Sequence, residues 1–328
     1  MVTRYLRPLE ILRRLLRGRL FLVVKILIAT LLFGGLLILL NPLRLWNNLL
    51  QIEPLLVAIA LLCGGAGVLV QWVKWQCLLR FYYAGITWGE GLNSLLIGFV
   101  FGLVSPGRLG ELGRGLFLGR DRVALVGLAA VDRCSSVVVT LLIAWLGLLM
   151  LFPDRTLWLL GALSGSGLLV FIALKILRRK VKKWPYAARI WNVFQDIPLR
   201  LWGKVLGWSS VFNFIFFLQF YLLLNNRVAL PLEGLWGIPL IFGLKAVLPL
   251  SFLDLGVREG AAVLVFSHIG IDPVPAFNAA LLLFAINVFL PGLIGLALLQ
   301  RNWSLGEREL LSSAKEPAHF VLEGASNE

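Results

Sequence analysis

Residues 106–114 read Pro-Gly-Arg-Leu-Gly-Glu-Leu-Gly-Arg, and residues 249–258 read Pro-Leu-Ser-Phe-Leu-Asp-Leu-Gly-Val-Arg. In both stretches a carboxylate follows the proline at the fifth position, and Leu-Gly and an arginine come after it. Proline interrupts a helix because it lacks a backbone donor, and an ionisable group in hydrocarbon is costly unless it is paired or faces water. Both stretches lie in apolar sequence, so they predict two interrupted, charged segments within a membrane.

The composition of the chain is that of a membrane protein. Hydrophobic residues make up 59% of its 328 positions, charged residues make up 15%, and the mean hydropathy is +0.88. Soluble domains average about 45–50% apolar and about 25% charged residues. We therefore predict an all-α integral membrane protein with several spans, because helices satisfy their own backbone hydrogen bonds in lipid.

The net charge of +14 does not by itself indicate nucleic-acid binding. The basic residues gather at the ends of apolar stretches, where they set topology and contact anionic headgroups. Cys63, Cys77 and Cys134 lack CxxC spacing, and we expect neither a metal nor a cofactor. The sequence contains no HExxH, GxSxG, DxD or P-loop pattern, so we do not expect an enzyme.

Six apolar stretches are long enough to cross a bilayer, whose hydrocarbon core needs about 20 helical residues. They are 20–40, 55–75, 124–152, 157–177, 205–225 and 277–299. Two shorter apolar pieces, 92–105 and 235–250, each end at one of the patterned segments. We expect broken or re-entrant helical hairpins at about 92–118 and 235–271; two short crossings are the alternative for the second.

The distribution of positive charge predicts the orientation of the spans, because short cytoplasmic loops are rich in lysine and arginine. Residues 1–19 and the loop 178–204 carry such clusters. If the first hairpin enters and leaves on the cytoplasmic side, the six long helices alternate and both termini are cytoplasmic. The transmembrane domain then covers 20–300 and is followed by a polar tail at 301–328. We expect this domain in the inner or plasma membrane of a bacterium.

The order of these segments predicts an inverted repeat. Helix 55–75, the first hairpin and helix 124–152 correspond to helix 205–225, the second hairpin and helix 277–299, in the opposite orientation. Repeats of this kind place broken segments near the middle of the membrane, where the substrate sites of transporters lie.

The ionisable residues in and near the two patterned segments are the candidates for a substrate site. They are Arg108, Glu111, Arg114, Asp132, Arg133, Lys245, Asp254, Arg258 and Glu259. The expected breaks in the hairpin helices are Pro106, Gly107, Gly113, Pro249 and Gly256.

Helical spacing suggests how these charges pair, since residues three or four apart share a face. Glu111 is expected to pair with Arg114, and Asp254 with Arg258. The expected partners in the other two cases are Arg108 or Arg114 for Asp132, and Glu111 or Glu259 for Arg133.

Two interpretations of the charges stay open. In the first, arginines such as Arg108, Arg114 and Arg258 bind a lipid phosphate, together with helix N-termini. The carboxylates would then balance charge, bind a cationic headgroup or carry a proton. In the second, the charges cap the hairpins and lock their packing. The duplication favours the first interpretation.

The blocks 105–114, 130–133 and 248–259 resemble the flippase-like transmembrane family typified by the membrane region of lysylphosphatidylglycerol synthases. The similarity covers about residues 15–300. It implies a lipid flippase or lipid transporter that moves anionic or aminoacylated phospholipid, or a related polyprenyl- or terpenoid-type lipid, between leaflets. Membrane lipids, above all anionic phospholipids, are the implied partners.

The chain departs from the family pattern in two blocks. It has Asp132-Arg133 where members often have Glu-Arg, and Phe252-Leu253-Asp254 where they usually have glycines. We find no aminoacyl-transferase domain after residue 300 and do not expect lysyl transfer. The alternative functions are a membrane subunit or enzyme in modification of a lipid-linked substrate, and a structural partner of a lipid-modifying enzyme.

We predict that residue Ile190 is cytoplasmic, because the loop around it is rich in lysine and arginine. A cysteine introduced there, in a chain cleared of its own three cysteines, should react with an impermeant maleimide only after the cells are permeabilised. A cysteine at Asp154, in a link poor in positive charge, is the matched external control. Labelling of position 190 in intact cells would contradict the orientation.

Overall fold

The computed structural model describes residues 19–158, 161, 175, 184–225, 230–247 and 255–313. These residues form helices and contain no strand, as the all-α prediction requires. The longer helices are α2 (Arg19–Leu40), α4 (Pro54–Tyr82), α5 (Trp88–Val104), α6 (Arg122–Leu151), α9 (Leu199–Asn225), α10 (Leu232–Val247) and α13 (Leu290–Ser313). The shorter ones are α3 (Pro42–Leu50), α8 (Pro185–Asp196), α11 (Val257–His268) and α12 (Pro273–Phe284). Two 3₁₀ segments, η1 (Pro106–Phe117) and η2 (Pro153–Arg155), and a π-helical segment, η3 (Ala285–Phe289), complete the order.

Four helical stretches in the described residues are long and apolar enough to cross a membrane. They are Pro54–Tyr82, Arg122–Leu151, Leu199–Leu224 and Pro273–Arg301. Each contains or overlaps a predicted span. The predicted span 20–40 is helical as α2, whereas most of 157–177 lies outside the described residues. Leucines such as Leu62 and Leu142 are exposed on these helices, as expected for surfaces that face lipid.

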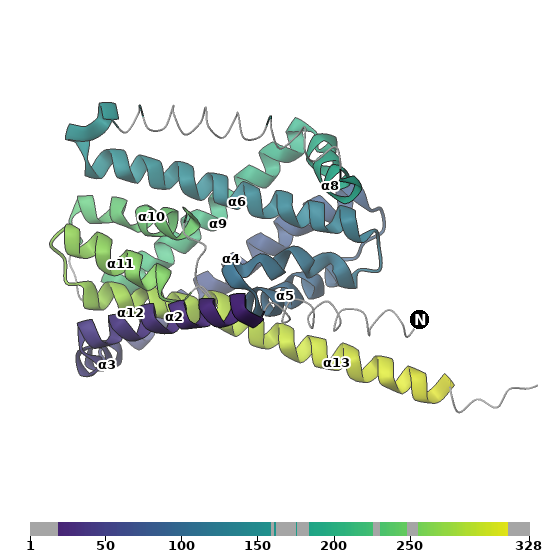
Figure 1. The fold of residues 1–328 in the computed structure, drawn as a ribbon, viewed down its shortest axis with the longest axis horizontal. Helices are drawn as coiled ribbons and strands as arrows, with labels where there is room; N and C mark the ends of the chain where they lie inside the picture. Colours follow the sequence, from purple (N-terminus) through teal and green to yellow (C-terminus); the bar gives the residue numbers. More distant parts are fainter. Residues whose placement is uncertain are drawn as a thin grey trace, which may run out of the picture.

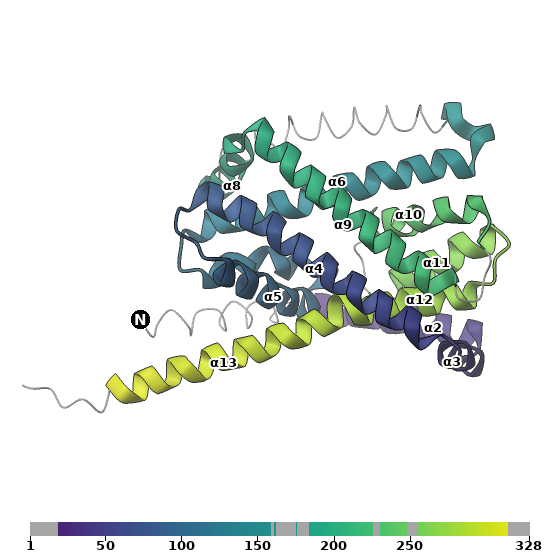
Figure 2. The ribbon, with the colours of Figure 1, turned by 180° about the vertical axis from the view of Figure 1, so that it is seen from behind.

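The helix α6 runs along one side of the molecule and packs against helices from both ends of it (Figure 1). Toward one end it contacts α10, and toward the other it contacts α8 and η1. Helices α4 and α9 lie side by side across the opposite side (Figure 2). The chain α12, η3 and α13 continues as one long helical path below them.

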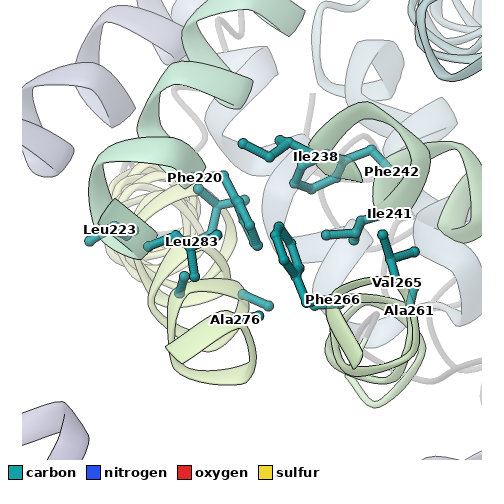
Figure 3. Close-up of a cluster of buried hydrophobic side chains, with 14 of the residues drawn as sticks. Phe220, Leu223, Ile238, Ile241, Phe242, Ala261, Val265, Phe266, Ala276 and Leu283 are labelled. Atoms are coloured by element: carbon teal, nitrogen blue, oxygen red, sulfur yellow. The ribbon is translucent and has the colours of Figure 1, made fainter. Parts of the chain in front are cut away.

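Two large apolar clusters form the core of the described residues. The first lies between α9, α10, α11 and α12, where the Phe220 ring packs against Phe242 and Phe266 at centroid distances of 5.7 and 6.3 Å (Figure 3). The second is built by residues of α4, α5, α6, α8 and the start of α9, with Trp75 and Leu128 fully buried. The cavity described below lies between helices that contribute to both clusters.

The first patterned segment folds as a helix that reverses into a 3₁₀ segment. A capping box at Thr87 and Glu90 starts α5, and α5 ends at Val104, with Ser105 as its C-cap. Then η1 packs back along α5. At the reversal Arg108 has a φ of +56°, a left-handed conformation that is uncommon for a residue with a side chain.

Glycines let η1 approach α5 so closely. A Cβ atom at Gly110 would lie 2.1 Å from the Phe101 carbonyl oxygen, and one at Gly98 would lie 2.6 Å from Arg114 Cβ. A run of 12 residues in 3₁₀ conformation is unusual, because such runs rarely exceed three or four residues. The side chains of Arg108, Glu111 and Arg114 are three positions apart on it and so lie on one face.

The second patterned segment follows α10 in the sequence, and its last two residues, Val257 and Arg258, begin α11, which packs against α10. Pro249 and Asp254 lie outside the described residues, and so does the expected pair of Asp254 with Arg258. Gly256 has a φ of +89° and begins α11, a conformation that favours glycine. The inverted repeat stays a prediction.

We predict that Gly295→Ala lowers the thermal stability of the protein, whereas Gly65→Ala does not. A Cβ atom at Gly295 on α13 would lie 2.1 Å from the Leu96 carbonyl oxygen on α5, while one at Gly65 on α4 would meet nothing within 4 Å. Overpacking of this kind costs about 1–3 kcal/mol. Thermal unfolding of both variants in one detergent measures the difference, and equal melting temperatures would contradict the close packing of α5 on α13.

Candidate functional site

Six of the nine predicted site residues line one cavity between the helices. They are Arg108, Glu111, Arg114, Asp132, Arg133 and Lys245. The cavity has a volume of about 1140 Å³, part of which is open to the surroundings. Its walls also include aromatic residues (Phe99, Phe212, Phe216 and Phe242) and uncharged polar residues (Gln71, Ser136, Thr140, Asn213 and Asn287). Charged groups therefore meet here inside an otherwise apolar protein.

The innermost charges form a buried triad of Lys74, Asp132 and Arg114. One carboxylate oxygen of Asp132 lies 3.1 Å from Lys74 Nζ, and the other lies 2.7 Å from an Arg114 guanidinium nitrogen. The side chains are between 1% and 10% exposed. Since the three residues come from α4, α6 and η1, the triad joins these elements at one point.

The amine of Lys74 is held by oxygen atoms on two neighbouring helices. It donates hydrogen bonds to Ser136 Oγ at 2.6 Å, Ser209 Oγ at 3.2 Å and the Asp132 carbonyl oxygen at 3.2 Å. These bonds satisfy the three donors of the ammonium group, which makes the burial of this lysine tolerable.

Arg114 is positioned by the aromatic and polar residues around it. Its guanidinium carbon lies 3.9 Å from the centre of the Trp75 ring, so the charge is stabilised by a cation–π contact. Its carbonyl oxygen accepts a hydrogen bond from Ser94 Oγ at 2.9 Å, and Trp75 Nε1 donates to the same hydroxyl at 3.2 Å. This network ties η1 to α5 and α4.

A second charge cluster, Arg108, Glu111 and Arg133, lies nearer the surface. Glu111 forms ion pairs with Arg108 and with Arg133, the latter at 3.0 Å. Arg133 also donates to the Arg108 carbonyl oxygen at 3.1 Å. The side chains are 16% to 32% exposed, so this outer cluster is accessible where the inner triad is not.

The pairing predicted within the first segment is wrong. Glu111 does not pair with Arg114 in the structure; it pairs with Arg108 on the same segment and with Arg133 on α6. Arg114 pairs instead with Asp132. The prediction assumed an α-helix and local partners, whereas the 3₁₀ segment packs against α6, which supplies partners of opposite charge. Two of the expected alternatives are confirmed: Asp132 pairs with Arg114, and Arg133 pairs with Glu111.

Arg258 and Glu259 lie outside the lining of this cavity. Both are fully buried at the start of α11, where they form an ion pair of 2.6 Å. Glu259 also accepts a hydrogen bond from the Gly256 backbone nitrogen at 2.7 Å, which caps the helix. In the described structure this pair therefore stabilises the start of α11.

The predicted hairpin breaks lie at different positions relative to the helices in the two patterned segments. Pro106 and Gly107 begin η1 directly after α5, and Gly113 lies inside η1, so the break comes at the start of the pattern. Gly256 lies at the start of α11, and Pro249 lies outside the described residues.

Sequence reasoning missed Lys74 and a set of buried amides. Lys74 lies at the end of the predicted span 55–75, and a lysine within such a run is itself a signal of a buried site. Two hydrogen bonds link these amides to side chains on neighbouring helices: Asn213 accepts from Thr140 at 2.7 Å, and Asn287 donates to Gln219 at 2.7 Å. Asn287 lies on the π-helical segment η3, a feature that is frequent at functional sites.

The cationic groups of this site are of a kind that can bind anions. Three guanidinium groups and a lysine line it, and guanidinium groups bind phosphate and carboxylate oxygens in a forked geometry. The described residues contain no group of three histidine, cysteine or acidic side chains that could hold a metal ion.

Comparison with known protein families gives a match over most of the chain. Residues 22–295 match the family model described as the lysylphosphatidylglycerol synthase TM region. Searches among curated proteins and among solved structures gave no match.

We predict that Asp132→Asn destabilises the protein more than Lys74→Met does. The first change leaves Lys74 and Arg114 side by side without a carboxylate, and loss of one partner of a buried ion pair costs about 3–5 kcal/mol. The second change leaves the Asp132–Arg114 pair balanced. Folded yield and thermal unfolding in detergent measure both effects.

The double variant Lys74→Met/Asp132→Asn is the control for charge balance. It should recover part of the stability that Asp132→Asn loses, because it removes one buried cation together with the carboxylate. A double variant less stable than Asp132→Asn would show that hydrogen bonding of Lys74, and not charge balance, holds the triad together.

Proposed function

Because this chain belongs to the family of the lysylphosphatidylglycerol synthase transmembrane region, we propose that it is a lipid flippase or lipid transporter whose charged cavity binds the headgroup. The family and the four apolar spans make the chain an integral membrane protein related to lipid modification or transport. The proposed substrate is an anionic or aminoacylated phospholipid, or a related lipid, that moves between leaflets.

The observation that carries the proposal is the gathering of Arg108, Arg114 and Arg133 in one cavity between apolar helices. Such charges are costly in a membrane protein, and most often they face a substrate pathway or each other. Each of these arginines already contacts a carboxylate, whose oxygen atoms resemble those of a phosphate. A lipid phosphate can therefore replace a carboxylate partner without a large change in geometry.

The two charge clusters lie at different depths in the cavity. The outer cluster is partly exposed, and a headgroup would meet Arg108 and Arg133 first. Arg114 in the buried triad would be reached second. The acyl chains would stay against the apolar outer surfaces of the helices, so only the headgroup needs a polar path.

Glu111 and Asp132 would then serve as internal counterions. In the empty cavity they reduce the electrostatic cost of four neighbouring cations, and during binding they release arginine donors to the phosphate. Arg258 is not part of this proposed contact set, because it is fully buried against Glu259 and does not line the cavity.

We predict that Arg108→Gln and Arg133→Gln lower the rate of lipid movement between leaflets at least about tenfold, since a hydrogen bond to a charged group contributes about 1.5–3 kcal/mol. Both side chains are partly exposed, so the variants should stay folded. The measurement is the movement of short-chain fluorescent anionic lipid in reconstituted vesicles, with thermal unfolding of each variant.

Arg44→Gln is the matched control, because Arg44 forms an exposed ion pair with Asp272 and does not line the cavity. It should move lipid at the rate of the unchanged protein. Normal lipid movement in folded Arg108→Gln and Arg133→Gln variants would show that the cavity is not part of the lipid pathway. Chemical modification of the lipid by the purified chain would instead support an enzyme.

A further inference from the structure

We propose that α3 is an interfacial helix, which lies along the surface of the bilayer and does not cross it. The side of α3 that carries Leu43, Trp46 and Leu50 then contacts lipid at the boundary between the headgroups and the acyl chains. The partner that this surface fits is the bilayer itself. The inference concerns a different part of the molecule from the charged cavity and does not depend on the proposed function.

The apolar residues of α3 divide between two sides of the helix. Leu43, Trp46 and Leu50 are three and four positions apart, so they share one side, and they are 57% to 71% exposed. Leu45 points elsewhere, is 5% exposed, and belongs to a core cluster with Phe277 of α12. One side of α3 is therefore packed on the protein, and a second apolar side is open.

Several contacts hold α3 in this orientation. The side-chain nitrogen of Asn278 on α12 donates hydrogen bonds to the Leu45 carbonyl oxygen and to Asn48 Oδ1, both at 2.9 Å. Arg44 forms an ion pair of 2.8 Å with Asp272, the residue that caps the start of α12. The exposed apolar side thus belongs to a helix that is anchored to its neighbours, and these contacts keep that side turned outward.

The position of α3 is where apolar helices end or begin. In the sequence α3 lies between α2, which ends at Leu40, and α4, which begins at Pro54. It also contacts α12, which begins at Pro273 and opens the apolar stretch Pro273–Arg301. Figure 1 shows α3 nearly end-on, whereas α2 and α12 lie along the picture, and α8 lies at the opposite end of the molecule. The axis of α3 therefore runs across the direction of the spans, at one end of them.

The length and composition of α3 fit the surface of a bilayer. Nine residues of α-helix extend about 14 Å, less than half of the hydrocarbon core of about 30 Å, so α3 cannot cross it. Amphipathic helices of this kind lie in the plane of the membrane surface, with the apolar side about 5–10 Å deep in the boundary region. Tryptophan is enriched at that depth, because its ring is apolar and its N–H group is polar, and Trp46 lies on the exposed side.

A second copy of the chain fits this surface less well than lipid does. A stable protein interface uses about 20–30 residues on each partner. The helix has nine residues, and only Leu43, Trp46 and Leu50 form its exposed apolar side. Lipid covers such a narrow apolar surface without a matching protein surface, so the bilayer is the occupant that we propose.

Spin labels on single cysteines measure the depth of this side in the full chain. The native cysteines are replaced, single cysteines are introduced at positions 43, 44, 46 and 50, and the labelled proteins are reconstituted in phosphatidylglycerol and phosphatidylethanolamine vesicles. The readout is the accessibility of each label to oxygen, which enters lipid, divided by its accessibility to a water-soluble nickel complex. Labels at Val138, which is 48% exposed in the middle of α6, and at the exposed Asp154 give the values for hydrocarbon and for water.

We expect the ratio at positions 43, 46 and 50 to lie between the values at Val138 and Asp154. It should also be several-fold higher than the ratio at position 44, because the Arg44 side chain is 63% exposed and lies on another side of α3. Equal thermal unfolding of the labelled variants is the control for folding.

Each other result would overturn the inference. Ratios equal to that at Asp154 would place this side of α3 in water, and ratios equal to that at Val138 would place it deep in the hydrocarbon. Low accessibility to both reagents would show that protein covers the surface. Disulfide cross-linking between copies at position 46 would then identify a second copy of the chain as the occupant.

Trp46 provides an independent measure of depth. The difference in fluorescence between the unchanged chain and the Trp46→Phe variant isolates the signal of this residue from the other tryptophans. We expect lipids brominated near the headgroup end of the acyl chain to quench this difference more strongly than lipids brominated near the methyl end. Equal quenching by the two lipids, or the reverse order, would contradict an interfacial position for α3.

Discussion

The ion pair between Arg114 and Asp132 is the contact on which the site depends. It joins the 3₁₀ segment η1 to the long helix α6, and through Lys74 it also holds α4. Removal of the shared carboxylate would leave two buried cations facing each other, so the three elements are held by one charge. The outer cluster repeats the arrangement, with Glu111 between an arginine of η1 and an arginine of α6. The walls of the cavity are thus fixed by the same groups that give it its charge.

Close backbone packing makes this arrangement possible. The 3₁₀ segment can place its arginines toward α6 only because it lies directly on α5, and Gly98 and Gly110 supply the space for that contact. The hydrogen bond from the Gly110 nitrogen to Ser105 Oγ, at 2.6 Å, closes the reversal. The small residues of the pattern and its charged residues therefore have separate tasks, the first in packing and the second in the cavity.

Much of the fold and part of the site could be predicted from the sequence. Hydrophobicity alone located the four described spans, because about 20 apolar residues are needed to cross a bilayer. The interruption at Pro106 and the gathering of charges from residues 108 to 133 followed from the cost of burying ionisable groups. The 3₁₀ conformation and the partner of Arg114 did not follow. They depend on which helices pack together, and Lys74 lies 58 positions before Asp132, so spacing gives no clue to their contact.

The π-helical segment Ala285–Phe289 sets the rotational phase between two stretches of one continuous helix. Before it, α12 faces α9 and α11; after it, α13 presents Gly292 and Gly295 to α5. Each residue of an α-helix rotates the chain by about 100° about the helix axis. Loss of a single residue here would therefore rotate α13 by about that angle relative to α12. Gly292 and Gly295 would then turn away from α5. The number of residues in this segment, more than the identity of any side chain, keeps α12 and α13 in contact with their separate neighbours.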